Sequence, residues 1–188
     1  MRRIDCFVSL PSQAAVLEKE IESASVHLVD ASLTRTSTLR RIASEAHAEF
    51  TLLYTRMTDL SLVRFALERM LQIADDTGAD LLYADRFLSK GGEVSMAPVI
   101  DYQSGSLRDD FDFGGLLLYR TSAFVDAVSR MDREYEAAAL YDLRLKVSQR
   151  GRLEHINEYL YYEIETDLRT SGEKLFDYVD PKNRNSQL

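Results

Sequence analysis

Cysteine is almost absent from this chain of 188 residues, in which Cys6 stands alone. A single cysteine excludes an internal disulfide and any metal site built from several cysteines. Cys6 lies within an apolar run, which favours a buried and unreactive thiol. The three histidines, His27, His47 and His155, are far apart and share no ligand spacing, so a zinc site is disfavoured as well.

Long apolar runs are also missing. No uninterrupted apolar segment approaches the roughly 20 residues that a membrane-spanning helix needs. The amino terminus shows no charged segment followed by an apolar stretch and a small-residue cleavage site. By elimination, we expect a soluble cytoplasmic protein without a transmembrane segment.

Positive charge is scarce, because 23 Lys and Arg face 31 Asp and Glu and the formal net charge is −8. Nucleic-acid surfaces need clustered Lys and Arg to meet the phosphates, so we expect no nucleic-acid partner. Arg35, Arg40 and Arg41 form the best local basic patch, and a solvated helix face is the favoured interpretation of it. Gly-rich phosphate-binding motifs and the Gly-x-Ser-x-Gly elbow are absent too.

What the chain does contain is a regular alternation of short apolar runs and amphipathic segments. Predicted strands cover residues 4–10, 26–29, 50–54 and 81–83, and predicted helices cover residues 13–23, 36–46 and 60–75. Ser12 is the expected N-cap of the first helix, and Asp59 or Ser61 that of the long one. This alternation predicts an α/β fold with a mainly parallel central sheet and helices on both faces.

The pattern changes after residue 90. Residues 90–93 are typical of a hairpin tip, and residues 98–112 form a long polar loop, which in a compact domain is functional or mobile. Further strands are expected over residues 114–119, 153–156 and 159–162, and further helices over residues 122–130 and before Gly151. We expect one domain over residues 1–180 and a polar tail over residues 181–188.

Three segments carry a family resemblance. Residues 48–54 (Ala-Glu-Phe-Thr-Leu-Leu-Tyr) precede a helix, residues 113–122 form a strand leading into a short helix, and residues 141–151 read Tyr-Asp-Leu-Arg-Leu-Lys-Val-Ser-Gln-Arg-Gly. In this order, over roughly residues 50–162, they resemble the metal-motif strand, a later strand and the Glu-Asp-x-Asp-Leu-x-x-Arg-Leu-x-x-x-Gly helix of family 2 glycosyltransferases. Residues 100–114 and 171–181 look like a divergent bacterial branch of that family.

The resemblance implies a GT-A type fold with a small antiparallel hairpin. It implies a nucleotide-sugar site over the carboxyl ends of the parallel strands, an acceptor site beside it, and usually a Mg or Mn ion. The implied partners are a nucleotide-sugar donor and a glycan or lipid-linked acceptor. Asp30 lies in a loose match of Val29-Asp30-Ala31-Ser32 to the family's Val-Asp-Asp-Gly-Ser run, and we expect it to contact substrate.

The chain departs from this family at two motifs. Residues 55–58 read Thr-Arg-Met-Thr where the family places its Asp-x-Asp metal pair. The family's general-base position matches Ala139 or Leu140, and only Asp142 survives from that acidic motif. Asp142 either complements the helix dipole or faces the acceptor pocket as a catalytic group.

Asp85 ends the fourth predicted strand and is the best surviving candidate for a metal ligand, because ligands bind at the carboxyl ends of parallel strands. Its alternative role is to initiate the turn that follows. Arg56 either replaces the metal by pairing with diphosphate, since guanidinium is permanently charged and bidentate, or pairs with Asp59 on the surface. We expect Tyr54 and Asp85 to end adjacent parallel strands that open onto one pocket.

The densest polar group consists of Arg108, Asp109, Asp110 and Asp112. Asp110 and Asp112 are the candidates for the base that accepts the acceptor's hydroxyl proton, and Arg108 is a candidate substrate contact. Carboxylates buried this close together would raise one another's pKa values. The alternative is a solvated loop in which one Asp is bonded to the backbone.

Two functions stay open at this point. The leading interpretation is transfer of a sugar from a nucleotide-sugar donor to a glycan or lipid-linked acceptor. The alternative is a catalytically inactive relative that acts as a binding or scaffold module in surface-glycan assembly. A phosphoryl-accepting receiver domain is disfavoured, because Pro11 and Thr55 stand where its acidic residues are needed.

Overall fold

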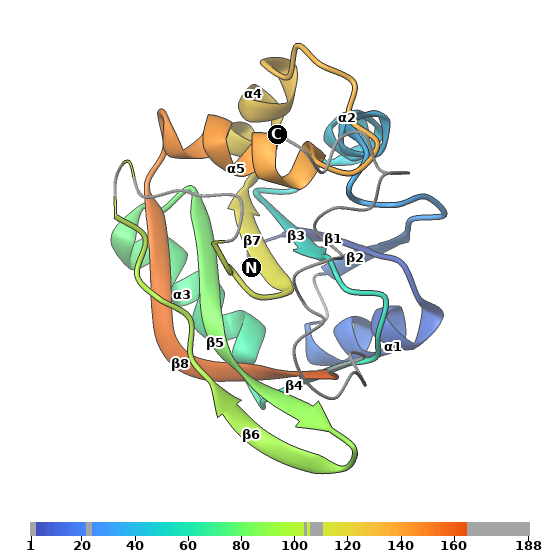
Figure 1. Ribbon diagram of the computed structural model, residues 1–188, viewed down its shortest axis with the longest axis vertical. Helices are drawn as coiled ribbons and strands as arrows, with labels where there is room; N and C mark the ends of the chain where they lie inside the picture. The colour runs from blue at the N-terminus through green and yellow to red at the C-terminus, as the bar shows by residue number, and fades with distance from the viewer. Residues whose placement is uncertain (1–2, 22–23, 104, 106–110, 165–188) are drawn as a thin grey trace, which may run out of the picture.

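One mixed sheet organises the part of the chain that the computed structural model describes, residues 3–21, 24–103, 105 and 111–164. Its strands are β1 (Ile4–Val8), β2 (Ala24–Leu28), β3 (Phe50–Tyr54), β4 (Leu60–Leu62), β5 (Leu81–Lys90), β6 (Glu93–Ala97), β7 (Leu116–Arg120) and β8 (Leu153–Ile164). They are ordered β2-β1-β3-β7-β5-β8-β4, and β6 pairs with β5 beyond the end of β7 (Figure 1).

β7 lies between β3 and β5, and its pairing with both shows how the strands of the sheet are oriented. It is antiparallel to both β3 and β5, so those two strands run the same way. β1 and β2 are parallel to β3, and β8 is parallel to β5, so most of the described strands share one direction. The predicted α/β fold with a largely parallel sheet is therefore confirmed.

Tyr54 and Asp85 are not on adjacent strands, so that prediction is wrong. Tyr54 pairs with Leu116 and Tyr83 pairs with Leu117, which places β7 between β3 and β5. Asp85 also lies inside β5 rather than at its end, so it does not initiate the hairpin turn. The register nevertheless brings the end of β3 level with the Tyr83–Asp85 stretch of β5.

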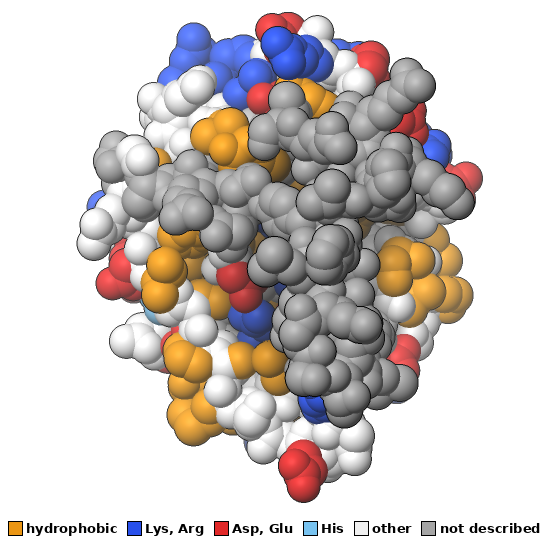
Figure 2. Space-filling view, viewed as in Figure 1, with side chains coloured by type: hydrophobic (Ala, Val, Ile, Leu, Met, Phe, Trp, Pro, Cys, Tyr) orange, Lys and Arg blue, Asp and Glu red, His pale blue; other side chains and the backbone are white. Residues whose placement is uncertain are grey.

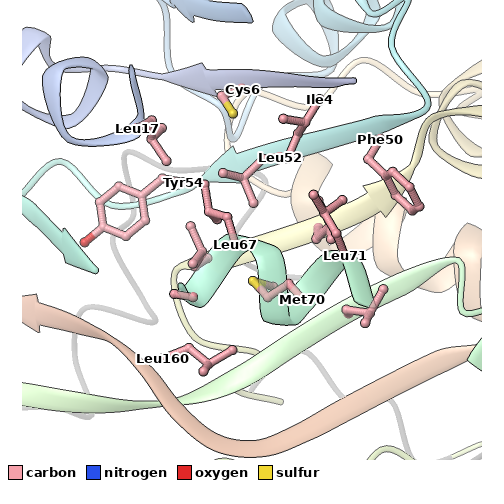
Figure 3. Packing of buried hydrophobic residues seen from close by; sticks show 14 of the residues in the cluster. Ile4, Cys6, Leu17, Phe50, Leu52, Tyr54, Leu67, Met70, Leu71 and Leu160 are labelled. Carbon is pink, nitrogen blue, oxygen red and sulfur yellow. The ribbon is translucent and has the colours of Figure 1, made fainter. Parts of the chain in front are cut away.

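The helices cover both faces of the sheet, as predicted. α1 (Pro11–Glu20) and α3 (Ala66–Thr77) pack on one face, and α2 (Thr36–Glu45), α4 (Thr121–Ser129) and α5 (Ala139–Ser148) pack on the other. Cys6 and Leu52 belong to the first core with Met70, as Figure 3 shows, whereas Phe7 and Leu53 belong to the second. Burial on both faces explains why these strands are almost continuously apolar in sequence.

The long helix begins later than the sequence indicated. Residues 60–62 form β4, which pairs antiparallel with β8, and α3 starts only at Ala66. Neither Asp59 nor Ser61 is its N-cap, since Phe65 occupies that position with a left-handed φ of 63°. Leu62 continues the helical stripe of Phe65 and Ala66, whereas Leu60 and Leu62 alternate with Ser61 as in a strand, and the chain pairs with β8.

The second half of the sheet is more continuous than expected. β5 runs on to Lys90 and turns into β6, which confirms the predicted hairpin. β8 is one strand of 12 residues rather than two short ones. A bulge lets it continue, because Ala84 pairs with Ile156 and the next residue, Asp85, pairs with Tyr159.

The basic patch of Arg35, Arg40 and Arg41 is paired with acidic side chains. Their partners are Glu136, Glu134 and Asp30 respectively. Acidic and basic side chains likewise lie side by side at the α4 end of the molecule in Figure 2. These arginines therefore behave as a solvated, neutralised helix face.

None of the helices in the described part of the chain is long and apolar enough to cross a membrane. The described elements share one sheet and two core clusters. The single domain over residues 1–180 stays a prediction, and the proposed tail over residues 181–188 lies outside the described residues.

Candidate functional site

The segment that follows β3 is held in place by a buried glutamine. Gln13 Nε2 donates hydrogen bonds to the carbonyl oxygens of Arg56 (3.0 Å) and Thr58 (2.6 Å). Gln13 Oε1 accepts the backbone N–H groups of Ser9 and Leu10, each at 3.0 Å. One fully buried amide therefore fixes the start of α1 and the stretch where the family carries its metal motif.

Sequence reasoning missed Gln13 and favoured Ser12 as the helix cap. Ser12 Oγ instead donates to Asp59 Oδ1 at 2.6 Å, and the capping bonds at the start of α1 come from Gln13. The available signal was Pro11 at the first helical position, which places Gln13 at the third, where a Glu or Gln side chain reaches back to the N-cap.

Four ionisable side chains meet at the carboxyl edge of the sheet, and we call Arg56, Arg86, Asp112 and Glu163 the charged cluster. Arg56 Nε lies 2.7 Å from Glu163 Oε1, and its Nη2 lies 3.9 Å from Asp112 Oδ1. Arg86 Nη2 donates to Asp112 Oδ2 at 2.6 Å, and its Nε lies 3.3 Å from Glu163 Oε2. The guanidinium groups of Arg56 and Arg86 are thus each within ion-pair distance of both carboxylates.

The charged cluster contains two residues that the sequence analysis named and two that it did not. Arg56 and Asp112 were expected at the site, and the structure brings them together. Arg56 pairs with Glu163 rather than with Asp59, so the alternative role given to it is wrong. Arg86 and Glu163 were not singled out, although a charged residue inside an apolar strand was a signal for Arg86.

Arg86 and Glu163 are buried, whereas Arg56 and Asp112 reach solvent. Their side chains are 8%, 9%, 42% and 49% exposed respectively. Burial alone would raise the pKa of Asp112, but the N–H of Gly114 and the Arg86 guanidinium outweigh it, and the pKa ends below its ordinary value. Asp112 is therefore ionised at neutral pH, as a proton acceptor must be.

Two glycines make room for the cluster at the start of β7. Gly114 has a φ of +73°, and a Cβ there would lie 2.2 Å from Tyr161 Oη. A Cβ on Gly115 would lie 2.7 Å from Arg56 Cγ and 3.0 Å from Glu163 Oε2. The buried Tyr161 hydroxyl accepts the Gly115 N–H at 2.8 Å, and this bond keeps Tyr161 close to the backbone of the two glycines.

A third guanidinium approaches from α5. Arg144 stacks over the ring of Phe113, with its Cζ 5.0 Å from the ring centroid. Burial lowers the pKa of Arg144, and its charge interacts with both Arg56 and Asp112. Among the described residues, Arg144 thus adds a third guanidinium whose charge acts on Asp112, and this positive charge suits an anionic ligand.

Asp85 belongs to a separate buried group on the same strand as Arg86. Asp85 Oδ1 accepts the Val99 N–H at 2.8 Å and lies 2.8 Å from His155 Nε2. His155 Nδ1 lies 2.6 Å from Asp101 Oδ1, so the imidazole bridges two carboxylates. Asp85 Oδ2 is buried and has no hydrogen-bond partner.

This group anchors the start of the polar loop. The His155 ring stacks on Tyr83, with 5.2 Å between centroids. The Tyr83 hydroxyl donates to the carbonyl oxygen of Ile100 and accepts the N–H of Tyr102. Burial raises the pKa of Tyr83 to about 12, so it stays a neutral donor at neutral pH.

The remaining predicted site residues make their contacts elsewhere or lie outside the described residues. Asp142 is in the first turn of α5, is buried, and pairs with Lys146 Nζ at 2.9 Å. Asp30 is exposed and accepts a 2.7 Å bond from Arg41, which lowers its pKa. Arg108 and Asp110 are outside the described residues.

The described residues do not fit the Mg or Mn ion that the resemblance implied. They contain no group of three or more His, Cys, Asp or Glu side chains that could hold a metal. The positions of the family's metal pair are Thr55 and Met57, and the nearby carboxylates of Asp112 and Glu163 already face guanidinium groups. A shallow depression of about 650 Å³ lies at another place, the start of α4, and is lined partly by Arg120, Thr121 and Val125.

Comparison with known proteins gives a structural match only. No family model matches the chain, and no curated protein matches it. S. aureus TarS 1–349 in complex with UDP-GlcNAc matches with a TM-score of 0.56 and 14% identity, over 92% of this chain and 60% of that one. TarS 1–349 alone (0.53, 12%, 87% and 60%) and its UDP complex (0.50, 15%, 87% and 51%) also match.

This chain therefore spans about 60% of the length of the TarS structure in the first of these matches. At 14% identity the likeness concerns the fold and not the chemistry. TarS is a GT-A glycosyltransferase, and the expectation of a GT-A-like α/β fold for this chain is thereby confirmed.

Proposed function

We propose that this chain binds a nucleotide sugar at the carboxyl edge of β3 and β5 and transfers the sugar to a glycan or lipid-linked acceptor. The observation that carries the proposal is the charged cluster, in which Arg56 follows β3 and meets side chains from β5, β8 and the segment before β7. Ligands of open α/β sheets bind at the carboxyl ends of the strands. The TarS match, whose structure holds UDP-GlcNAc, supports the same class of donor.

The described residues supply two of the functions that sugar transfer needs. Arg56 places positive charge where a leaving diphosphate would gather negative charge. Asp112 supplies an ionised carboxylate that can accept the acceptor's hydroxyl proton. Asp110 is the other proposed base, and Asp142 a further proposed catalytic group.

The other site assignments also stay proposals. Asp30 follows β2 at the same edge and would contact the donor nucleoside. Arg108 would contact the diphosphate or the acceptor. Asp85 as a ligand for Mg or Mn stays an untested prediction; its Oδ2 is unpartnered, but the described residues around it form no metal-binding group.

The second candidate function is a binding or scaffold module without transfer activity. It is favoured by the absence of carboxylates from residues 55–58 and by the pairing of Asp112 with Arg86. An ionised Asp112 that remains bonded to guanidinium is a poorer base, because the pairing lowers its affinity for a proton.

Binding and turnover separate the two candidates. Calorimetric titration with UDP-GlcNAc, UDP and GDP measures donor binding, and release of UDP from UDP-GlcNAc in the presence of glycan acceptors measures transfer. For a transferase, Asp112→Asn or Asp110→Asn should slow release by about 100- to 10,000-fold while nucleotide binding persists. Asp126→Asn, on α4, serves as the control.

Each outcome has a clear meaning. Binding together with UDP release that depends on one of these carboxylates supports the transferase. Binding without release from any acceptor favours the inactive module. If neither UDP, UDP-GlcNAc nor GDP binds, the nucleotide-sugar proposal is wrong.

A further inference from the structure

The charged cluster places guanidinium groups where the family implied by the sequence places a metal. Thr55 and Met57 stand at the positions of the metal pair and offer no carboxylate. Asp112 and Glu163, which lie near them, are each within ion-pair distance of both Arg56 and Arg86. A divalent cation at this place would have to displace arginine side chains and would meet their repulsion.

Arg56 is held by contacts that leave its outer end available. Gln13 fixes its carbonyl oxygen, and Nε forms an ion pair with the buried Glu163 carboxylate at 2.7 Å, without the geometry of a hydrogen bond. The side chain is 42% exposed, and Nη2 has only the 3.9 Å contact to Asp112 among its ion pairs with described residues. A guanidinium fixed at Nε presents its two Nη groups as a fork that matches phosphate oxygens.

Arg86 and Arg144 add positive charge near Arg56, and each has an N–H group without an acceptor in the described part of the chain. Arg86 Nη1 is buried and has no hydrogen-bond partner, and neither does Arg144 Nε. Both donors are buried, so they would act on an anion at this edge through their charge and not through direct hydrogen bonds. Among the described residues of the site, three guanidinium groups and two carboxylates leave a positive charge that acts in the same direction.

We propose that the pyrophosphate group of a nucleoside diphosphate binds here without a divalent cation, with Arg56 as its direct contact. Arg86 and Arg144 contribute positive charge, Glu163 positions the Arg56 side chain, and Gln13 positions its backbone. This inference rests on the proposed nucleotide-sugar site and specifies how that site neutralises the diphosphate.

The test is calorimetric titration of UDP into the full chain, once with EDTA and once with MnCl₂. We expect equal affinity in both buffers. Arg56→Ala should weaken binding by about 10- to 100-fold, the usual loss for a hydrogen bond between charged groups. Arg56→Lys should recover part of the affinity, because lysine keeps the charge and loses the fork. Arg69→Ala, which removes an exposed arginine paired with Glu158 on another surface, should bind as wild type.

The outcomes separate this inference from the proposed function. Binding that requires Mn overturns the metal-free diphosphate site and leaves the nucleotide-sugar proposal intact. Equal binding by wild type and by both folded Arg56 variants removes Arg56 from the site. Absence of UDP binding in either buffer contradicts both proposals. Thermal melting of each variant confirms that it is folded.

Discussion

His155 Nε2 lies 2.8 Å from Asp85 Oδ1, and both side chains are almost fully buried. His155 pairs with Tyr83 before the bulge of β8, and Asp85 is the first residue of β5 after it. The contact therefore joins two neighbouring strands and, through Val99, the start of the polar loop.

Loss of His155 should destabilise the fold. His155→Phe would remove the side-chain partner of the buried Asp85, and leaving a buried polar group short of a hydrogen bond costs about 1–3 kcal/mol. Asp101→Asn removes the exposed member of the same chain of contacts and should cost at most about 1 kcal/mol. Urea unfolding of the two variants checks this difference, and equal losses would contradict a buried Asp85–His155 pair as the main contribution.

Gln13 should matter more than its neighbour Ser12. Gln13→Ala removes four hydrogen bonds of a fully buried side chain, so we expect a loss of about 2–4 kcal/mol and weaker UDP binding. Ser12→Ala removes one exposed bond to Asp59 and should change stability by less than about 1 kcal/mol. Unfolding curves together with UDP titration measure both effects. A stable Gln13→Ala protein with normal UDP affinity would show that the segment after β3 is fixed by other contacts.

Gly115→Ala should weaken UDP binding more than it weakens the fold. The added Cβ would lie 2.7 Å from Arg56 Cγ, and a flexible arginine can move away at the expense of its position. We expect about a tenfold loss of UDP affinity, the scale of one charged contact. Gly91→Ala, in the open β5–β6 turn with a φ of +59°, strains the backbone without touching the cluster. Normal affinity in Gly115→Ala would mean that Arg56 does not need its observed position.

Asp112 should contribute stability that disappears in acid. Its folded-state pKa lies below the ordinary 3.8, so the contribution is fully present above that value and is lost as the pH falls through the folded-state pKa. Asp112→Asn should therefore show a shallower loss of stability than wild type between about pH 5 and pH 2. Chemical denaturation across this range provides the measurement, and parallel pH profiles would contradict the proposed role of Arg86 and Gly114.

Much of the secondary structure could be predicted because it depends on local pattern. The apolar runs at residues 4–10 and 50–54 and the amphipathic helices between them follow from burial of each strand on both faces. The segment at residues 60–62 was predicted wrongly, because Leu62 extends the apolar stripe of the helix that follows and only pairing with β8 selects a strand. The site was predicted in part, since Arg56 and Asp112 were named and Gln13, Arg86 and Glu163 were not.

The sequence by itself determined the α/β class, the two-sided core and the lack of a carboxylate pair after β3, since these depend on residue type and local period. Tertiary structure alone decided that β7 separates β3 from β5 and that Arg56 meets Glu163. Strand order and register are set by packing between distant segments, and a local pattern contains no information about which distant charges will face each other.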